Sequence, residues 1–240
     1  MLYVFDVNET LLDLAPLDDL VAEALGGEVG RALSRREWFD RMIRSALALT
    51  AAGTYVPFGR LAGAALRDLA GERGREVTDE QVAALAHGIR HLPAHPDVVP
   101  ALSGLRAHGH RVVTLTNSVR EVAEEQLTTS GLRGLVDAVY SADEVQRLKP
   151  ALEPYRMVLE QERADAAVLV AAHDWDVAGA AAAGLATVFV AREGRRPFGA
   201  VTAPTFVIDD LDRLAAMAPF TDARFAPSPV PEDRRHAGDV

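Results

Sequence analysis

The chain has 240 residues, of which 49% are hydrophobic, so it is long enough to bury one sizeable core or a core domain with a smaller companion. Its formal net charge of −10 at pH 7 argues against a general nucleic-acid-binding protein, because little positive charge is available to neutralise phosphates, although a pocket can still hold a small anionic substrate. The sequence has no cysteine, which excludes disulfides and cysteine-ligated metals.

The N-terminal third of the chain combines one short apolar strand with a long helical stretch. The apolar run at residues 2–5 predicts a buried strand, and apolar residues at helical spacing then continue from about residue 15 to residue 92. Two capping-box patterns, Ser34 with Glu37 and Thr78 with Gln81, predict helix starts. The predicted helices cover residues 17–27, 34–53, 58–74 and 78–92.

From about residue 96 the pattern changes to alternating helices and apolar strands. Strands of this kind, separated by helices, are typical of a parallel sheet that is covered on both faces. Ser118 and Glu121 form a third capping-box pattern. The predicted helices cover residues 97–109, 119–131, 149–162 and 176–184, and the predicted strands cover residues 111–117, 135–141, 166–172, 186–191 and 205–209.

These patterns predict a doubly wound α/β core that is interrupted, after its first strand, by an all-helical insert. We expect the core to comprise residues 1–14 and 93–220 and the insert to comprise residues 15–92, whereas residues 221–240, rich in proline and charge, predict a flexible tail. No uncharged apolar stretch reaches the roughly 18 residues that a membrane span needs, and the first apolar run is too short for a signal peptide. We therefore expect a cytoplasmic protein that does not bind membranes.

Reactive side chains follow the ends of several predicted strands. In open parallel sheets, ligands bind beyond the carboxyl ends of the strands. The residues that end or directly follow these strands are Asp6, Thr116, Asn117, Ser141 with Lys149 a short loop later, and His173 with Asp176. The sequence thus predicts that two carboxylates, a hydroxyl, an amide and an amine converge in one crevice.

Four segments, FDVNETLLD, TLTNS, LKP and HDWDVAGA, resemble in this order the four motifs of the haloacid dehalogenase (HAD) superfamily. The helical insert is similar to that superfamily's cap domain. More narrowly, YVPF in the insert, KP followed by Tyr155, and WD in the last motif resemble the type II branch, the L-2-haloacid dehalogenases. The resemblance covers residues 1 to about 215 and implies a HAD-like core with a cap.

The resemblance implies a catalytic role for four residues. Asp6 would be the nucleophile that forms an ester with the substrate, and Thr10 would orient it. Lys149 would keep Asp6 ionised, because a nearby cation favours a charged carboxylate. Asp176 would orient Lys149 or the water that hydrolyses the ester.

The same resemblance implies a set of residues that bind the substrate or the leaving group. Phe39 stands where the branch has an arginine that binds halide and substrate carboxylate, and Arg35, Arg36 and Arg41 lie near it in the sequence. If none of these arginines reaches the site, activity on ordinary 2-haloacids would be weak or absent. His173, where the branch often has an amide, would either position water or bond a backbone group. The expected binding residues are Thr116, Asn117, Asn8, Phe39, Phe58, Tyr155 and His173.

Position 8 favours one chemistry over another. Phosphatases of the superfamily resemble one another in having a second acid there, which protonates a departing alkoxide. Asn8 cannot act as an acid, whereas a halide leaves without a proton. The position that usually supplies a further Mg²⁺ ligand in these phosphatases is Ala172, so we expect no metal and no other cofactor.

The leading hypothesis is therefore hydrolysis of the carbon–halogen bond in a short 2-haloalkanoic acid. One alternative is a Mg²⁺-dependent HAD phosphatase that acts on a small phosphate ester, and another is a catalytically weakened protein that only binds a small ligand. The resemblance also implies a homodimer. Simpler roles remain open for single residues: Asp6 as a turn residue, Lys149 as a surface lysine, Asp176 as a helix N-terminal acid, and Phe39, Phe58 and Trp175 as packing residues.

Overall fold

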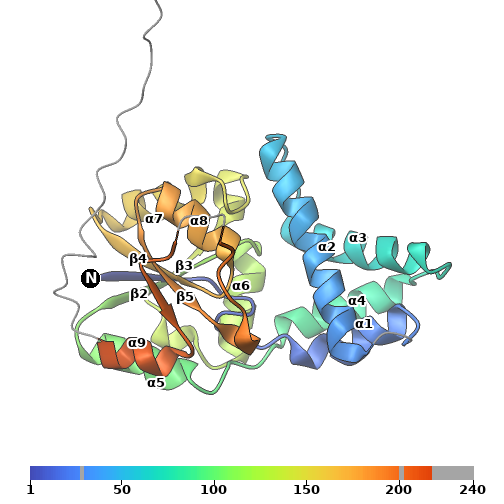
Figure 1. Cartoon of the computed structure of the whole chain (residues 1–240), viewed down its shortest axis with the longest axis horizontal. Helices are drawn as coiled ribbons and strands as arrows, with labels where there is room; N and C mark the ends of the chain where they lie inside the picture. The colour runs from blue at the N-terminus through green and yellow to red at the C-terminus, as the bar shows by residue number, and fades with distance from the viewer. Residues whose placement is uncertain (28–29, 200–202, 218–240) are drawn as a thin grey trace, which may run out of the picture.

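A parallel sheet forms the centre of the protein. The computed structural model describes residues 1–27, 30–199 and 203–217, and within them the strands follow the order β3-β2-β1-β4-β5-β6 (Figure 1). All neighbouring strands pair in parallel. The strands are β1 (Leu2–Phe5), β2 (Arg111–Thr116), β3 (Ala138–Ser141), β4 (Ala167–Ala171), β5 (Ala186–Val190) and β6 (Phe206–Ile208).

Helices cover both faces of this sheet, because side chains on a strand alternate between its two sides. Leu2 and Val4 of β1 belong to one buried cluster, whereas Tyr3 and Phe5 belong to another. In Figure 1 the helices α7 and α8 lie on one face, and α5 and α9 on the other. The predicted doubly wound α/β core is therefore confirmed. The core helices are α5 (Val98–Ala107), α6 (Arg120–Thr129), α7 (Leu152–Glu162), α8 (Asp174–Ala182) and α9 (Leu211–Met217).

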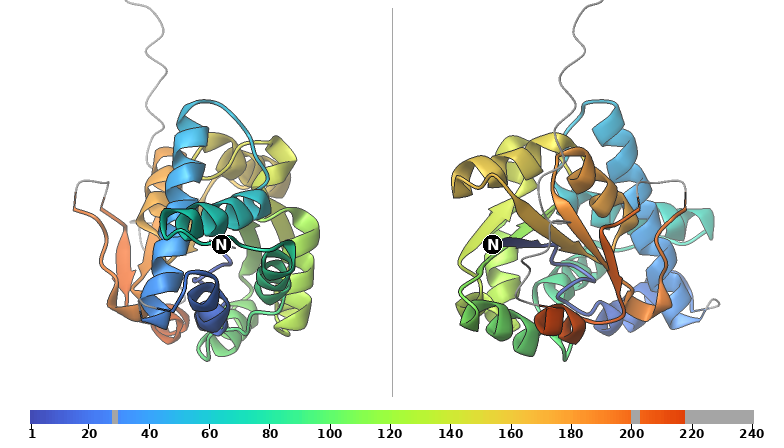
Figure 2. Two further views of the ribbon diagram at one scale, coloured as in Figure 1. Left: turned by 90° about the vertical axis from the view of Figure 1, so that its right-hand side faces the viewer. Right: turned by 60° about the vertical axis from the view of Figure 1, so that its left-hand side comes forward.

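Four helices between β1 and α5 gather beside the core (Figures 1 and 2). The longest, α2, turns one apolar face inward, and the indole of Trp38 on that face donates a hydrogen bond of 2.9 Å to the Ala62 carbonyl of α3. This arrangement agrees with a helical cap inserted after the first strand, while the exact limits of the two domains stay a prediction. The helices are α1 (Asp18–Ala24), α2 (Arg31–Ala51), α3 (Phe58–Glu72) and α4 (Asp79–Arg90).

Of the three predicted capping boxes, one is present. Thr78 and Gln81 form the expected capping box at α4. Ser34 does not cap a helix, because α2 begins at Arg31 and Ser34 is buried inside it. Ser118 does not cap α6 either, because its backbone N–H bonds Thr116 and its hydroxyl accepts a bond from Asn8.

Short 3₁₀ turns and a late helix account for the other differences from the predicted elements. The start of the predicted strand at 135–141 lies in a turn, and a capping box that was not predicted, Ser141 with Glu144, opens the next turn. Helix α9 was not predicted, and the predicted tail at 221–240 lies outside the described residues. The turns are η1 (Ala15–Leu17), η2 (Arg133–Leu135), η3 (Ala142–Val145) and η4 (Arg192–Gly194). Among the described residues, no helix combines the length and apolar character needed to cross a bilayer.

Candidate active site

A buried lysine joins two carboxylates at the carboxyl edge of the sheet. Lys149 Nζ lies 2.9 Å from Asp6 Oδ1 and 2.6 Å from Asp176 Oδ2, and it donates a third hydrogen bond of 2.9 Å to the Leu115 carbonyl. The Lys149 side chain is 0% exposed. Its three donors are thus all used, as a buried ammonium group requires. Residues from four separate segments meet here because their strands end at the same edge.

The two carboxylates have different acidities. Burial raises the pKa of Asp6, but the opposing effects of Lys149, then His173 and the Thr10 hydrogen bond, bring the pKa of Asp6 below its usual value. Burial likewise raises the pKa of Asp176; Lys149 lowers it, but the neighbouring Asp6 charge raises it, and the pKa of Asp176 stays above its usual value. Asp6 is therefore suited to remain an ionised nucleophile, and Asp176 is suited to accept a proton.

Thr10 holds the second oxygen of Asp6. Its hydroxyl donates a hydrogen bond of 2.7 Å to Asp6 Oδ2 and accepts one of 3.0 Å from the backbone N–H of Ala172. The chain turns back between the two residues at Glu9, whose φ of 61° lies in the left-handed region. This turn brings Thr10 under Asp6, so that both carboxylate oxygens have fixed partners.

Tyr155 and Asn117 lie behind these charges. The Tyr155 hydroxyl is fully buried and donates a hydrogen bond of 2.6 Å to Asp176 Oδ1. The Asn117 amide accepts a bond of 2.8 Å from the backbone N–H of Lys149 and lies 3.5 Å from the Lys149 carbonyl. Both side chains thus orient charged residues, and the predicted substrate contacts of Tyr155 and Asn117 stay predictions.

The side chains of Asn8 and Thr116 also form hydrogen bonds with other residues of the protein. The Asn8 amide donates to Ser118 Oγ at 3.3 Å and accepts a bond of 3.0 Å from Gln126. The Thr116 hydroxyl accepts a bond of 3.2 Å from the backbone N–H of Ser118. These contacts fix the turn after β2 next to the turn after β1. The predicted roles of Asn8 and Thr116 in substrate binding stay predictions.

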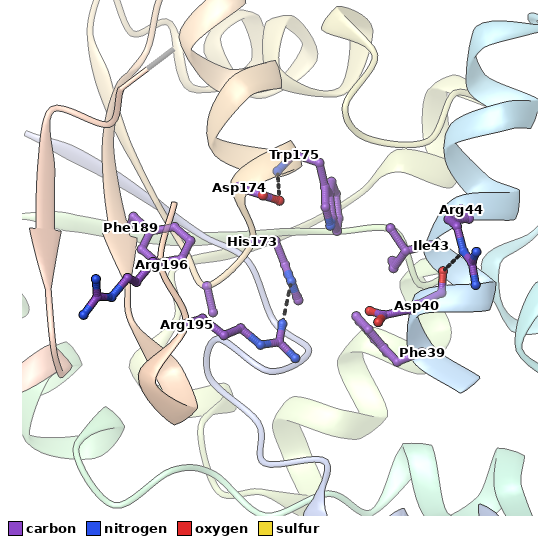
Figure 3. Close-up of a pocket in the computed structure, with 11 residues that line it drawn as sticks. Phe39, Asp40, Ile43, Arg44, His173, Asp174, Trp175, Phe189, Arg195 and Arg196 are labelled. Atoms are coloured by element: carbon purple, nitrogen blue, oxygen red, sulfur yellow. Dashed lines mark hydrogen bonds between the residues drawn. The ribbon is translucent and has the colours of Figure 1, made fainter. Parts of the chain in front are cut away.

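His173 is clamped between two aromatic rings. Its ring stacks on Phe39 of the cap, with centroids 5.4 Å apart, and on Trp175, with centroids 5.1 Å apart. Figure 3 shows Arg195 pointing toward the same imidazole, with Nη1 at 3.4 Å from Nδ1. Since a guanidinium only donates, a hydrogen bond at this contact requires Nδ1 to accept.

The Nε2 atom of His173 faces three oxygens of the first turn. It lies 3.3 Å from the Asn8 carbonyl, 3.6 Å from Glu9 Oε2 and 3.8 Å from Asp6 Oδ2. Nε2 is therefore directed at the Asn8 backbone carbonyl and lies close to the Asp6 carboxylate. Of the two roles expected for His173, the bond to a backbone group is present, and the positioning of water stays a prediction.

Two hollows meet at Phe39. A cleft of about 640 Å³ lies between α2 and the α8 side of the core, and its lining includes Phe39, His173 and Trp175 (Figure 3). An apolar cavity of about 310 Å³ lies on the other side of Phe39, and Asn8 and Phe58 are among its lining residues. Phe39 and Phe58 are thus both packed and pocket-lining. Asp6 lines neither hollow, but the first is lined by His173, 3.8 Å from Asp6 Oδ2, and the second by Asn8, two residues after Asp6.

A second buried charge cluster, which the sequence did not reveal, adjoins the first. Arg35, 2% exposed, bonds Asp18 at 2.6 Å, Glu9 at 3.2 Å and Glu193 at 3.0 Å. Arg195 also pairs with Glu9, at 2.8 Å. These residues join the cap helix α2 to the core. Only the helix position of Arg35, one turn before Phe39, hinted at such a contact.

The arginines expected near Phe39 are all occupied. Arg35 is saturated by its carboxylates, Arg36 pairs with Glu193 at 2.7 Å, and Arg41 pairs with Glu72 at 2.8 Å. Phe39 itself has no charge to offer. A cation for a substrate carboxylate must therefore come from another part of the cap or core.

The donor set at the sheet edge does not fit Mg²⁺. Magnesium prefers about six oxygen ligands in an octahedral shell. The oxygens of Asp6 and Asp176 are engaged by Lys149, Thr10 and Tyr155, and position 172 is an alanine. Within residues 1–27, 30–199 and 203–217, no group of three or more His, Asp or Glu side chains has an arrangement that could hold a metal ion.

Comparisons with known proteins agree with the fold and the motifs. The model of the haloacid dehalogenase-like hydrolases matches residues 1–184. The (S)-2-haloacid dehalogenase H-109 of Pseudomonas putida is 26% identical over 215 residues, which are 88% of this chain and 95% of that protein. The solved structure of the L-2-haloacid dehalogenase RSc1362 is 29% identical with a TM-score of 0.83, and the match covers 89% of this chain and 96% of that one. A plasmid-encoded phosphoglycolate phosphatase of Cupriavidus necator is 34% identical over 136 residues, which are 55% of this chain and 58% of that protein.

Since the family match spans most of the sequence, the chain belongs to the haloacid dehalogenase-like hydrolases. The resemblance that the four motifs indicated is thus confirmed. The relatives that align over most of the chain include named 2-haloacid dehalogenases. The phosphatase aligns over a shorter region.

Proposed function

We propose that this protein hydrolyses the carbon–halogen bond of a short 2-haloalkanoic acid and releases halide and a 2-hydroxy acid. The observation that carries the proposal is the pairing of an ionised, buried Asp6 with Lys149, next to an asparagine in place of a second acid. The likeness to (S)-2-haloacid dehalogenases over most of the chain supports the same reaction.

In the first step, a carboxylate oxygen of Asp6 attacks carbon 2 of the substrate from the side opposite the halogen. A carbon–oxygen bond forms, the carbon–halogen bond breaks, and the halide leaves with the bonding electron pair, so carbon 2 is inverted. Lys149 and Thr10 hold the attacking carboxylate in one orientation. No proton is needed, because a halide ion is a stable leaving group.

In the second step, water attacks the ester carbonyl of Asp6. Asp176, the more basic carboxylate, accepts a proton from that water, and the ammonium of Lys149 stabilises the negative charge that develops on the ester oxygen. The bond between the Asp6 carbonyl carbon and the product oxygen then breaks. The departing oxygen takes up the proton that Asp176 accepted, the other proton of the water is released to solvent, and Asp6 is regenerated as a carboxylate.

Asn8 separates this reaction from phosphate ester hydrolysis. Its amide is held by Ser118 and Gln126, and an amide has no acidic proton to give to a leaving alkoxide. The likeness to phosphoglycolate phosphatase makes a Mg²⁺-dependent phosphatase the second candidate. The poor fit of the donor set to Mg²⁺ weighs against it.

A paired assay separates these two functions. Halide release from 2-chloropropionate is measured with a chelator present, and phosphate release from an aryl phosphate is measured with Mg²⁺. We expect halide release that is unaffected by the chelator and abolished in Asp6→Asn. Phosphate release alone would overturn the proposal. Binding of a 2-hydroxy acid with neither product formed would instead favour the ligand-binding alternative.

A single turnover in water enriched in ¹⁸O tests the covalent step. Because water attacks the carbonyl carbon of the ester, the label should enter the carboxylate of Asp6 rather than the product. We detect it by mass spectrometry of the peptide that contains Asp6. Label found only in the 2-hydroxy acid would contradict the ester intermediate.

The proposal extends to three further properties of the protein. We propose that the enzyme needs no metal or other cofactor, that it is cytoplasmic, and that it forms a homodimer. The lack of cysteine fits a reducing compartment. The small anionic substrate is its expected partner, and neither nucleic acid nor a membrane is required.

A further inference from the structure

The proposed substrate is an anion that must approach a site rich in carboxylates. Asp6, Asp176 and Glu9 lie within or beside that site, and Lys149 is shared between the first two. A free carboxylate would therefore be repelled unless a further cation binds it. The following inference rests on the proposed function and asks which residue supplies that cation.

The cleft of about 640 Å³ offers arginines that are already neutralised or turned away. Arg195 pairs with Glu9, and Arg44 bonds the backbone carbonyl of Asp40 and lies close enough to interact electrostatically with the Asp40 carboxylate. Figure 3 shows Arg196 pointing away from His173 and Phe39. Two acids, Asp40 and Asp174, line the same cleft. The cleft thus has no strongly positive wall that would bind the carboxylate of the substrate.

The apolar cavity of about 310 Å³ has the opposite character. No aspartate or glutamate is among the described residues that line it, whereas Arg60 and Arg90 are. Arg90 is paired with Glu125 at 2.5 Å. Arg60 forms no ion pair with any acid in the described part of the chain. It is therefore the uncompensated cation of this cavity.

The position of Arg60 connects the cap to the catalytic turns. It lies in the first turn of α3, which carries no acidic side chain, two residues after Phe58. Asn8 and Ser118, from the turns after β1 and β2, line the same cavity. A small molecule in this cavity can thus contact Arg60 from the cap side and the edge of the sheet from the core side.

The walls of the cavity strengthen such a contact. They are mainly apolar, and Trp38, Met42 and Ile89 are among them. In a weakly polar environment an ion pair is screened less than in water, and an unpaired cation attracts an anion more strongly. Arg60 itself is exposed, so it can meet a substrate before the substrate is enclosed.

We propose that Arg60 binds the carboxylate of the 2-haloacid and thereby determines specificity for anionic substrates. The guanidinium matches a carboxylate with two parallel hydrogen bonds. It takes the place of the charge that Phe39 cannot provide. In this role Arg60 contacts the carboxylate of the substrate and not the reacting carbon, the halogen or Asp6. Its loss should therefore weaken substrate binding more than it slows the bond-breaking steps.

The test compares Arg60→Gln with Arg67→Gln and the wild type. Arg67 lies on the same helix but outside the cavity lining, where it pairs with Asp79 at 2.5 Å. We expect Arg60→Gln to raise KM for 2-chloropropionate at least tenfold and to change kcat less than threefold. It should leave kcat/KM for the neutral 2-chloropropionamide unchanged. Arg67→Gln should match the wild type on both substrates.

Binding of lactate, the expected product from 2-chloropropionate, gives a second readout that needs no turnover. Calorimetric titration should show an at least tenfold higher Kd for Arg60→Gln and an unchanged Kd for Arg67→Gln. Equal lactate binding by the wild type and Arg60→Gln would overturn the inference, and so would equal losses on acid and amide. If the wild type releases no halide but its lactate binding depends on Arg60, the proposed reaction fails while the role of Arg60 stands.

Discussion

Lys149 lies closer to Asp176 than to Asp6, with Nζ at 2.6 Å from Asp176 Oδ2 and at 2.9 Å from Asp6 Oδ1. The one cation is therefore shared between the carboxylate that would attack the substrate and the carboxylate that would activate water. Since burial and the Asp6 charge keep the pKa of Asp176 above its usual value, Asp176 is the better proton acceptor. The two steps of the reaction can thus be separated by substitution.

Asp176→Asn should form the ester but hydrolyse it slowly. The amide still accepts a hydrogen bond from Lys149 but cannot take a proton from water, which should slow ester hydrolysis by about 10²–10⁴-fold. Rapid-quench measurements should show a burst of about one halide per chain, as expected when the second step of covalent catalysis is slow. Intact-protein mass spectrometry should show the alkylated enzyme.

Asp174→Asn is the matched control for this prediction. Asp174 is two residues away, and its carboxylate accepts a hydrogen bond from the backbone N–H of Trp175. The Asp174→Asn variant should turn over within about threefold of the wild type, because Asp174 lines the wall of the cleft and forms no ion pair with Lys149 in the described part of the chain. Steady turnover by Asp176→Asn, without a burst, would show that another group activates water.

Thr10 should set the pH at which activity is lost in acid. Its hydrogen bond to Asp6 lowers the pKa of Asp6, after burial and the larger effect of Lys149 are counted. Thr10→Val removes this bond, so the pKa of Asp6 rises and the acid limb of kcat/KM moves to higher pH. The loss of a hydrogen bond to a charged group is worth about 1.5–3 kcal/mol, or roughly a 10- to 100-fold lower kcat/KM.

Thr10→Ser keeps the hydroxyl and serves as the conservative variant. Its pH profile should return close to that of the wild type, because the donor to Asp6 Oδ2 is restored. The profiles are measured as kcat/KM for 2-chloropropionate across the acid range. If the valine and serine variants move the acid limb equally, the methyl group of Thr10 rather than its hydroxyl controls Asp6.

Much of the fold could be predicted from the spacing of apolar residues along the sequence. The apolar runs and the helical spacing predicted the parallel sheet, because each residue pattern matches its element without help from distant residues. The convergence of Asp6, Lys149 and Asp176 was predictable for the same reason: strand ends in a parallel sheet share one edge. Local pattern therefore defined the position of the charges.

Contacts between residues that lie far apart in the sequence could not be predicted in this way. Arg35 bonds Glu9 and Glu193, which lie 26 and 158 residues away, and no local pattern joins these three residues. The incorrectly predicted capping boxes have a similar cause. The backbone N–H and the hydroxyl of Ser118 form hydrogen bonds with Thr116 and Asn8 rather than with the first turn of a helix. Side chains with several available partners follow tertiary geometry more than sequence motif.

Gly179 should be required for the placement of the Lys149 loop. A methyl group at this position would lie 2.7 Å from Pro150 Cβ, from the Pro150 carbonyl and from the Tyr155 hydroxyl. Helix α8 would therefore have to move away from Pro150 and Tyr155. Overpacking of this kind costs about 1–3 kcal/mol. Gly179→Ala should therefore lower the free energy of unfolding in urea by that amount, and it should reduce kcat because Lys149 shifts.

Gly71→Ala provides the control for helix propensity. Gly71 lies in α3 and has no atom within 4 Å of an added methyl group. Alanine there should stabilise the protein by about 0.5–1 kcal/mol, because it restricts the unfolded chain. A stabilising effect at both positions would mean that α8 can move away from Pro150 without cost.

The buried position of Arg35 makes its removal costly, whereas its neighbour should be dispensable. Arg35→Met leaves Asp18 without its cation in a site where the arginine is 2% exposed, whereas Glu193 keeps Arg36 and Glu9 keeps Arg195. Loss of one partner from a buried ionic cluster costs about 3–5 kcal/mol. Urea unfolding at neutral pH measures this change.

Arg36→Met separates burial from charge, since both arginines pair with Glu193. The Arg36 side chain is 47% exposed, so solvent screens its ion pair and the variant should lose less than about 1 kcal/mol. If the two variants lose equal stability, the cluster around Arg35 is hydrated enough to behave as a surface ion pair. Adding Glu9→Gln to Arg35→Met should recover part of the loss, because it removes one of the carboxylates that Arg35 had neutralised.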